Sequence, residues 1–530
     1  MSFTPANLSL RGGLNLADAD SELAPGECKE LVNYEINTVG RYQRVTGFER
    51  YDGRESPSST RVVDLPGYPF ATDDAALAAL YLEIEARRTA ILEVPGSGAV
   101  TGVFSFAGQV FAMRNTADGT ATKLYRSTVT GWNEVTTPAL SPGGQLVIKQ
   151  ANFSGSAAGL ELIGVDGKNP AFRFDGTTYT QITGPITPDA PTNLEVLPSQ
   201  VLLIAYRGGS FVFSKIGDPT VFDPVEGGGE IAVADEITEM QMQADNTCVI
   251  GCRNRTYMLY GTGKEDFQLK SLSTKVGMRK RTGQVLSDFI FLDDRGLSSL
   301  TRVQQFGDFA QSTVSQKVQP LLEQYLDRDV CSVTVKTKNQ YRLFFNDGYS
   351  LFGTFNAEGI PEFSTINYGV PISCAYSAED TSGVEHVYVG SDNGFVYQLD
   401  KGFSFDGLEY ESYLLTGFMN FGSPEIKKKW HKLVVECDSV TEVLLSAIAY
   451  LDYMDPDIPE DDLLIGSGDK WDLADWDDAV WGGSSMSWAD MYIAGVSRNI
   501  ALYLSNTSDR MPPHIISNLY LHSKPVSRRR

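Results

Sequence analysis

The chain has 530 residues, of which 42% are hydrophobic and 11% aromatic, so it is long and apolar enough for several folded domains and is not a disordered chain. Its 44 basic and 67 acidic residues give a formal net charge of −23. This balance argues against a main surface that grips nucleic-acid phosphates, but it allows an acidic wall past which DNA slides, and solubility alone would also account for it.

The cysteines and the N-terminus narrow the class of protein further. The chain has no signal-peptide pattern and no apolar run of membrane-spanning length, so we expect folding in a reducing cytoplasm without membrane insertion. Six scattered cysteines do not form a disulfide framework. Only Cys248 and Cys252 are close together, and without a second pair we expect them to pack in a strand rather than bind zinc.

Residues 1–60 are rich in turn and charge signals and poor in long apolar runs. Such a segment is more suited to lying along another domain, or along a neighbouring subunit, than to folding alone. We therefore assign residues 1–60 to an extended or platform segment, and we expect removal of residues 1–50 to leave a folded propeller but to weaken assembly.

The clearest helical pattern covers about residues 73–93, within a helical insertion at 61–100. Thr72 can cap it, Pro95-Gly96 ends it, and one face carries the apolar residues Leu77, Leu80, Tyr81, Ile84 and Ile91. We expect this helix either to pack across the outside of a sheet structure or to reach a partner.

Residues 101–400 repeat one hairpin pattern. Its clearest copy is HVYVGSDNGFVYQLD at 386–400, in which two alternating runs flank a Ser-Asp-Asn-Gly turn. Strands of this kind must stack on like neighbours, which predicts an irregular β-propeller of six to eight blades, some of them incomplete. A short helix at 319–327 is expected to connect blades. The basic run KVGMRKRTG at 275–283 reads as a solvated loop or as a contact for DNA or an acidic partner.

The sequence pattern changes at residue 401, and residues 401–530 are predicted to form a β-sandwich-like platform. Lys427, Lys428, Lys429 and Trp430 enter a strand, where lysines either block unwanted edge pairing or contact another subunit. An acidic stretch at 455–490 suggests calcium through Asp455, Asp457, Asp461 and Asp462, but it lacks the EF-hand spacing. Its tryptophans, which form either cross-strand pairs or a surface loop that could grip a sugar, are Trp471, Trp476, Trp481 and Trp488.

Recognisable catalytic motifs are missing from the sequence. The four histidines, His386, His431, His514 and His522, have no supporting motif, and we find no nucleophile elbow, phosphate loop or His-Glu-x-x-His. A sialidase-like propeller would show Ser-x-Asp-x-Gly-x-Thr-Trp boxes, and Ser391-Asp392-Asn393-Gly394 does not fit that pattern, although paired carboxylates from distant blades stay open. We predict a protein that is not an enzyme, with no catalytic residues, cofactor or metal.

Several separated patches resemble one family. Gly12-Gly13-Leu14-Asn15, Pro25-Gly26-Glu27, Asn33-Tyr34-Glu35, Arg44, Gly47-Phe48-Glu49-Arg50 and Arg87-Arg88 are similar to the tail nozzle, or tail tubular B-type, proteins of short-tailed bacteriophages. The similarity extends from Arg11 to about Asp438 and includes the lysine-rich strand after the propeller.

The resemblance implies a structural virion protein, assembled in the host cytoplasm and located in the tail. Such proteins form a sixfold ring below the head-to-tail adaptor, contact fibre or spike proteins, and retain double-stranded DNA in a channel until ejection. The candidate inter-subunit contacts are then Arg41, Arg44, Arg87, Arg88, Lys427, Lys428, Lys429 and Trp430. The alternatives are a tail-associated propeller whose Trp-rich region binds a host-surface glycan or a fibre protein, and a cellular scaffold propeller, since fold does not imply function.

Overall fold

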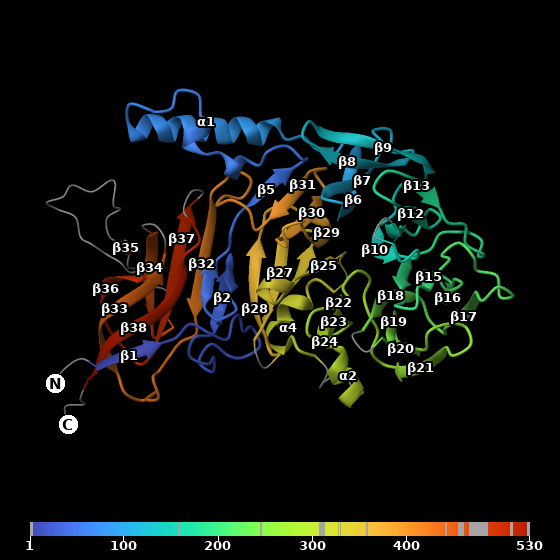
Figure 1. Cartoon of the computed structure of the whole chain (residues 1–530). Coiled ribbons are helices and arrows are strands. Elements are labelled where there is room, and N and C mark those ends of the chain that lie inside the picture. Colours follow the sequence, from blue (N-terminus) through green and yellow to red (C-terminus); the bar gives the residue numbers. More distant parts are fainter. Residues whose placement is uncertain are drawn as a thin grey trace.

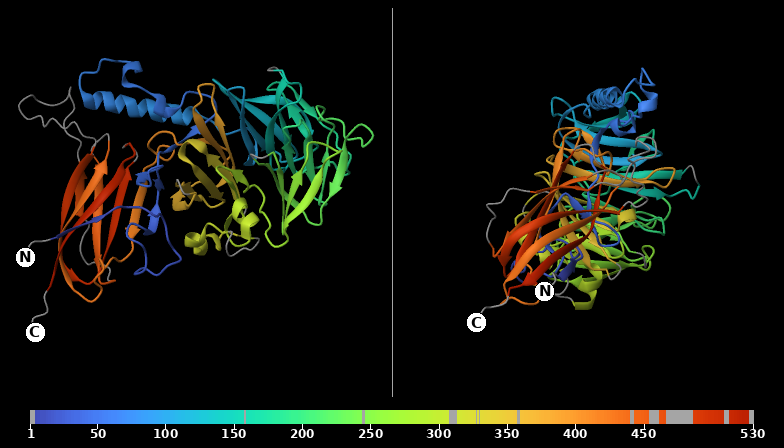
Figure 2. Two further views of the ribbon diagram at one scale, coloured as in Figure 1. Left: turned by 60° about the horizontal axis from the view of Figure 1, so that its bottom comes forward. Right: turned by 90° about the vertical axis from the view of Figure 1, so that its left-hand side faces the viewer.

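The computed structural model describes residues 4–156, 159–243, 246–306, 313–326, 328, 330–356, 359–439, 443–453, 461–465, 486–508 and 512–526. Within these ranges the chain is almost entirely β-structure, arranged as a propeller beside a two-sheet platform, with one long helix above them (Figures 1 and 2). None of the described helices is long and apolar enough to span a membrane.

Seven antiparallel sheets in the described residues form the blades of the propeller. The first four are four-stranded and follow chain order. Their strands are β6 (Ser97–Phe106), β7 (Gln109–Asn115), β8 (Thr122–Thr128) and β9 (Gly131–Leu140); β10 (Val147–Asn152), β11 (Leu160–Val165), β12 (Phe172–Phe174) and β13 (Tyr179–Gln181); β14 (Asn193–Val196), β15 (Leu202–Tyr206), β16 (Ser210–Phe213) and β17 (Gly229–Ala232); and β18 (Ile237–Met242), β19 (Cys248–Cys252), β20 (Thr256–Tyr260) and β21 (Gln268–Ser273).

The remaining three blades differ from one another in how they are completed. Blade 5 has three strands, β22 (Gln284–Val285), β23 (Phe289–Leu292) and β24 (Leu297–Ser299), followed by the short helix α2 (Leu300–Phe306). Blade 6 contains β25 (Val330–Val335), β26 (Gln340–Phe345), β27 (Tyr349–Phe355) and β28 (Pro361–Asn367). Blade 7 contains β29 (Ile372–Glu379), β30 (Glu385–Ser391) and β31 (Val396–Leu399), and β5 (Phe48–Tyr51) completes it from the N-terminal segment.

Hydrophobic clusters between neighbouring blades hold the propeller together. Phe104 and Phe111 of blade 1 pack against Phe174 of blade 2, with the Phe111 and Phe174 ring centroids 5.0 Å apart. Cys248 and Cys252 lie in the apolar core between blades 3 and 4, as their strand pattern predicted. Burying a phenylalanine side chain contributes about 1.5–3 kcal/mol, so these clusters explain why like hairpins stack in a ring.

The platform consists of two packed sheets, which confirms the sandwich prediction. One sheet has the order β3 (Tyr34–Ile36), β4 (Tyr42–Arg44), β38 (Ile515–Pro525), β33 (Lys428–Asp438) and β36 (Met486–Ser497), with β1 (Thr4–Leu8) also paired to β38. The other contains β2 (Cys28–Val32), β32 (Tyr410–Thr416), β37 (Ile500–Ser508), β34 (Val443–Leu451) and β35 (Asp461–Ile465). Their facing side chains form one apolar core that includes Trp430, Leu502 and Leu519.

The platform and the propeller share a continuous sheet. β2 pairs in parallel with β28, the outer strand of blade 6, through Val32 and Thr365, so blade 6 continues into the platform as a nine-stranded sheet. The Thr365 hydroxyl donates a hydrogen bond of 2.8 Å to the Leu31 carbonyl. The outer edge of blade 6 is therefore covered within the chain, and no flexible linker separates the two parts.

The N-terminal segment is part of both cores, which argues against the expectation that the propeller stays folded without residues 1–50. Strands β1 to β4 lie in the platform, whereas β5 pairs with β31 and closes the propeller. Phe48 is 2% exposed and packs against Tyr368, Tyr397 and Phe405. The turn signals of this segment mark short strands separated by tight turns.

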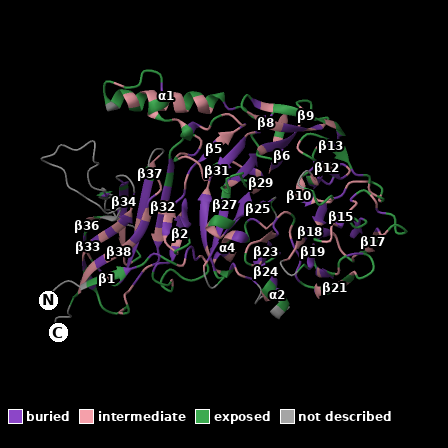
Figure 3. Cartoon of the chain, viewed as in Figure 1, coloured by how far each residue is buried: buried purple, intermediate pink, exposed green. Residues whose placement is uncertain are grey.

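The long helix α1 (Asp73–Ala90) begins where the sequence predicted, since the Thr72 hydroxyl accepts a hydrogen bond of 3.2 Å from the Ala75 amide. It projects from the edge of blade 1 above the platform (Figure 1), and its exposed and half-buried residues contrast with the buried strands (Figure 3). Besides the loops at its ends, it contacts the 3₁₀ turns η1 (Pro57–Ser59) and η2 (Val62–Asp64). The predicted apolar face therefore does not dock on a sheet, and only Ile91, just past the helix, is fully buried.

The other helix prediction was partly correct. A 3₁₀ turn, η4 (Gln316–Val318), leads into α4 (Gln319–Leu322), which lies between blades 5 and 6. It ends after four residues, whereas α2 was missed because it follows directly on the strand β24 without a cap signal.

Candidate functional site

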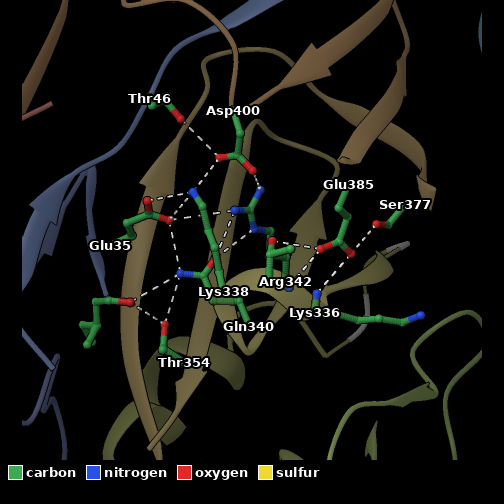
Figure 4. A network of polar contacts seen from close by, with 12 residues as sticks. Glu35, Thr46, Lys336, Lys338, Gln340, Arg342, Thr354, Ser377, Glu385 and Asp400 are labelled. Atoms are coloured by element: carbon green, nitrogen blue, oxygen red, sulfur yellow. Dashed lines mark hydrogen bonds and ion pairs between the residues drawn. The ribbon is translucent and has the colours of Figure 1, made fainter. Parts of the chain in front are cut away.

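Four charged side chains meet where the platform joins the propeller (Figure 4). Glu35 comes from β3 of the platform, Lys338 from the 3₁₀ turn η5 (Lys336–Lys338), Arg342 from β26, and Asp400 directly follows β31. Arg342 pairs with Asp400 at 2.7 Å, and Lys338 pairs with Asp400 at 3.0 Å and with Glu35 at 2.8 Å. This junction cluster thus joins blade 6, blade 7 and the platform.

Neutral side chains complete the hydrogen bonds of the junction cluster. The Gln340 amide donates to Glu35 at 3.1 Å, and its carbonyl oxygen accepts two bonds from Arg342 at 3.0 and 3.2 Å. Thr46 donates to Asp400 at 3.3 Å. The buried charges of Glu35 and Arg342 and the half-buried charges of Lys338 and Asp400 thus lie together with polar partners, which is the condition under which buried charges are tolerated.

The charges of the cluster are mutually stabilised. Burial alone would raise the pKa of the Asp400 carboxyl, but Arg342 and Lys338 outweigh it and hold that pKa well below its usual range. Burial alone would lower the pKa of the Lys338 ammonium, but the nearby carboxylates of Glu35 and Asp400 raise it. Groups that stay ionised in this way do not exchange protons near neutral pH, so the cluster is suited to locking the two parts together rather than to acid–base chemistry.

Arg44 is also buried at this junction, which corrects its assignment as an inter-subunit contact. Its guanidinium donates to the Ser412 hydroxyl at 3.2 Å and to the Tyr410 and Ser508 carbonyls at 3.2 and 2.6 Å. It also lies 3.9 Å from the centre of the Tyr410 ring. The residue is fully enclosed by this chain and holds β4 against β32 and β37.

Lys428 and Trp430 require the same correction. The Lys428 ammonium donates to the Asn420 and Ser423 carbonyls at 2.8 and 3.0 Å, and Trp430 is 1% exposed with its indole N–H on Ser497 at 2.7 Å. Strand alternation explains the result, because every second residue of β33 points into the sandwich. Lys427 and Lys429, by contrast, are exposed.

The remaining predicted contacts lie at the surface. Arg41 donates to the Ser517 hydroxyl at 3.2 Å, and Arg87 pairs with Glu55 at 2.8 Å. Arg88 pairs with Glu85 at 2.6 Å and approaches Asp406 to 3.6 Å, which fastens the C-terminal end of α1 to the loop that follows β31.

Of the four tryptophans in the predicted receptor loop, one lies in the described residues. Trp488 lies on the edge strand β36 and is 67% exposed, while Trp471, Trp476 and Trp481 lie outside the described residues. Asp455 and Asp457 of the calcium reading also lie outside them, whereas Asp462 accepts a hydrogen bond of 2.8 Å from Ser446. Within the described ranges no group of three or more His, Cys, Asp or Glu side chains could hold a metal ion.

The histidines do not come together. His514 is buried beside the Tyr34 hydroxyl at 2.9 Å, and His386 lies 3.1 Å from Asp380 on the outer part of blade 7. His431 stacks edge-on against Tyr492 of the neighbouring strand. His386 thus has its neighbours in the propeller, whereas His514 and His431 have theirs in one sheet of the platform.

The residues of the junction cluster were not predicted as a site. Glu35 is part of a patch that carries the family resemblance, but Lys338 and Arg342 lie in one turn and strand, and Asp400 in another, some 300 or more residues further along the chain. Local patterns cannot pair such residues, and only the closure of the propeller brings them together.

Comparison with known proteins identifies no family for this chain. No family model matches the chain, and no curated protein matches it. Among solved structures, the chain is similar to a streptogramin B lyase, with 12% identity, 58% of this chain and 95% of that chain covered, and a TM-score of 0.38. It is also similar to the C-terminal WD40 domain of Sif2 (13% identity, 56% and 82% covered, TM-score 0.33) and to the WD40 domain of a Toxoplasma gondii coronin (9% identity, 70% and 87% covered, TM-score 0.38). At these identities the likeness concerns the fold alone.

Proposed function

We propose that the chain is a structural subunit of the distal tail nozzle of a short-tailed bacteriophage. In this role several copies, six by the family resemblance, form a ring below the head-to-tail adaptor and continue the channel that retains DNA until ejection. Its work is mechanical, as a wall and a seal, rather than catalytic.

The observation that carries the proposal is the exposed apolar surface of α1. Residues 75–82, AALAALYL, contain no charged side chain. Leu77 is 46% exposed and Leu82 is 74% exposed, although both lie on a helix that projects from the body of the protein. Exposed apolar residues in an uncharged stretch of a projecting helix are typical of a protein–protein contact, and a second copy of the chain is the partner that a ring requires.

The rigid junction supports the same role. The patches that carry the family resemblance include Glu35, which ties the platform to the propeller, Arg44, which holds platform strands together, and Phe48, which belongs to the strand that closes blade 7. A subunit that must keep its shape under the pressure of packaged DNA needs its two halves fixed to each other. The shared sheet and the buried charges supply that connection.

The proposed contact through α1 can be tested with a matched pair of variants. In Leu77→Asp/Leu82→Asp the charges fall on exposed positions, so the free energy of unfolding should change by no more than about 1 kcal/mol. We expect this variant to remain monomeric when mixed with the cognate head-to-tail adaptor, whereas Val225→Asp, at a more exposed apolar position between β16 and β17 of blade 3, assembles normally. Assembly of the double variant at the wild-type level, measured by sedimentation, would show that α1 is not part of the contact between subunits.

A second candidate role is attachment to a host-surface glycan or to a fibre protein. Trp488 and Tyr492 are four residues apart on β36, so they lie on the same face of an edge strand, and Tyr492 is also largely exposed. Loss of glycan retention in Trp488→Ala with intact assembly would favour this role.

A further inference from the structure

The propeller encloses a polar cavity on its axis. The cavity has a volume of about 250 Å³, and the first strand of every blade, from β6 to β29, contributes to its wall. The side chains in this wall include Lys149, Glu239, Gln241, Gln284 and Tyr376. Hydrogen-bonding groups and one aromatic ring therefore surround a space of the size of a small molecule.

A smaller cavity of about 110 Å³ adjoins it where the first strands begin. The two cavities share Val147, Asn193 and Arg281 in their walls. Four cationic side chains line this mouth cavity, and they are Lys168, Arg207, Lys280 and Arg281. The residues come from blade 2, blade 3 and the connection between blades 4 and 5, so only the closed propeller brings them together.

The positive charge of the mouth is incompletely neutralised. Lys280 pairs with Glu236 at 2.7 Å, but Lys168 and Arg207 are exposed and have no ion pair within the described part of the chain. Asp166, which also lines the mouth, already accepts bonds from the amides of Lys168 and Asn169 at 2.8 and 2.7 Å. An excess of cations around one cavity is unusual in a chain with a net charge of −23.

Arg281 occupies the boundary between the two cavities and is only partly satisfied. One terminal nitrogen donates to the Ser373 carbonyl at 2.8 Å, while its buried Nε has no hydrogen-bond partner among the described residues. The backbone holds this residue in the left-handed region at φ 59°, which costs a non-glycine residue about 1–3 kcal/mol and is characteristic of functional positions.

The acidic side chains deeper in the cavity repel an anion only weakly, because their negative charge is reduced. Lys149 already binds Glu195 at 2.9 Å and Gln241 at 2.8 Å. Burial raises the pKa of Glu239 to about 7 even though Lys149 is nearby, so this carboxyl is partly protonated at neutral pH and can donate a hydrogen bond.

We propose that the axial cavity binds an acidic saccharide unit, a hydroxyl-bearing small molecule that carries one carboxylate or phosphate group. The anionic group lies in the mouth against Arg281, Arg207 and Lys168, where guanidinium groups can form paired hydrogen bonds to its oxygens. The hydroxyl groups reach the amides and carboxyl of the deeper wall, and Tyr376 offers a ring surface. The site lies within one propeller, so it does not depend on ring assembly.

Titration calorimetry on the full chain tests this inference with four probes. Glucuronate carries a carboxylate and glucose 6-phosphate carries a phosphate group. As controls, glucose lacks the acidic group and inorganic phosphate lacks the sugar. We expect one of the two acidic sugars to bind at least tenfold more tightly than glucose and than inorganic phosphate. The preferred acidic sugar then identifies the charged group as carboxylate or phosphate.

Variants locate the site. Lys168→Gln/Arg207→Gln changes only exposed side chains and should weaken binding of the preferred sugar at least tenfold, and Arg281→Gln should do the same. Lys275→Gln, an exposed lysine of the same basic segment that does not line either cavity, should bind as the parent does. Equal binding of glucose, binding of inorganic phosphate alone, no binding of either acidic sugar, or affinity unchanged in the double variant would each overturn the proposal.

Discussion

The buried Arg342 and the half-buried Asp400 form an ion pair at 2.7 Å that joins the second strand of blade 6 to the end of β31 in blade 7. Since β31 pairs with β5, this ion pair lies beside the strand that closes the propeller. Glu35 extends the same cluster into the platform (Figure 4). One group of charges therefore lies both where the propeller closes and where the platform is attached.

Removing one charge of this cluster should be costly. Asp400→Asn leaves Arg342 enclosed without its nearest anion, and breaking a buried pair in this way destabilises a protein by about 3 kcal/mol or more. Urea unfolding of the purified chain measures the change. Asp64→Asn breaks an exposed pair with Arg61 and should change the free energy of unfolding by less than about 1 kcal/mol. Equal effects of the two substitutions would contradict a stabilising role for the cluster.

The ionised Asp400 also predicts acid sensitivity. Its pKa is lowered in the folded chain, so its contribution is complete above the unfolded pKa of about 4 and is lost as the pH falls below that value. We expect Asp400→Asn to lose less stability than the parent between pH 4 and pH 3. Parallel pH profiles would show that this carboxylate is not preferentially stabilised in the fold.

His514 predicts a second pH dependence in a different range. Burial and the charge of Arg44 lower its pKa to about 3. As the pH falls below about 6.5, the unfolded chain binds a proton that the folded chain excludes, so stability should fall by about 1.4 kcal/mol per pH unit. His514→Asn should flatten the stability profile between pH 6.5 and 5, and an unchanged slope in this variant would contradict the account.

The packing of β5, the strand that completes blade 7, gives a prediction about stability. Phe48 lies in an aromatic cluster, and Phe48→Ala should destabilise the chain by about 3–5 kcal/mol through lost burial and a cavity. Val129→Ala, at an exposed turn of blade 1, serves as the control and should have almost no effect.

Deletion of residues 1–51 removes β5 and four platform strands, so the remaining chain should fail to form a propeller that resists proteolysis. A protected fragment covering residues 97–399 would show that the propeller closes without its N-terminal strand.

The net charge predicts weak interaction with DNA. A ring that lets DNA slide should not form stable complexes with duplex DNA at physiological salt, because phosphate binding requires clustered cations. A gel-shift titration of the assembled ring should show no retained complex. Tight binding that disappears at high salt would instead indicate a cationic bore.

The sequence predicted much of the fold but little of the junction. Alternating apolar runs with Gly turns identify hairpins such as residues 385–399, because that pattern is local and repeated. The inward direction of Trp430 and Lys428 could not be read from the lysine-rich run, since strand alternation does not say which face is buried. The pairing of β5 with β31 joins residues about 350 positions apart, and the charges that depend on it are equally non-local.

Electron microscopy of the chain mixed with the cognate head-to-tail adaptor tests the nozzle proposal most directly. We predict closed sixfold rings attached to the adaptor, with α1 of each subunit against its neighbour and no rings in the Leu77→Asp/Leu82→Asp variant. Monomers that never attach to the adaptor, at concentrations where the adaptor itself is intact, would contradict the proposal.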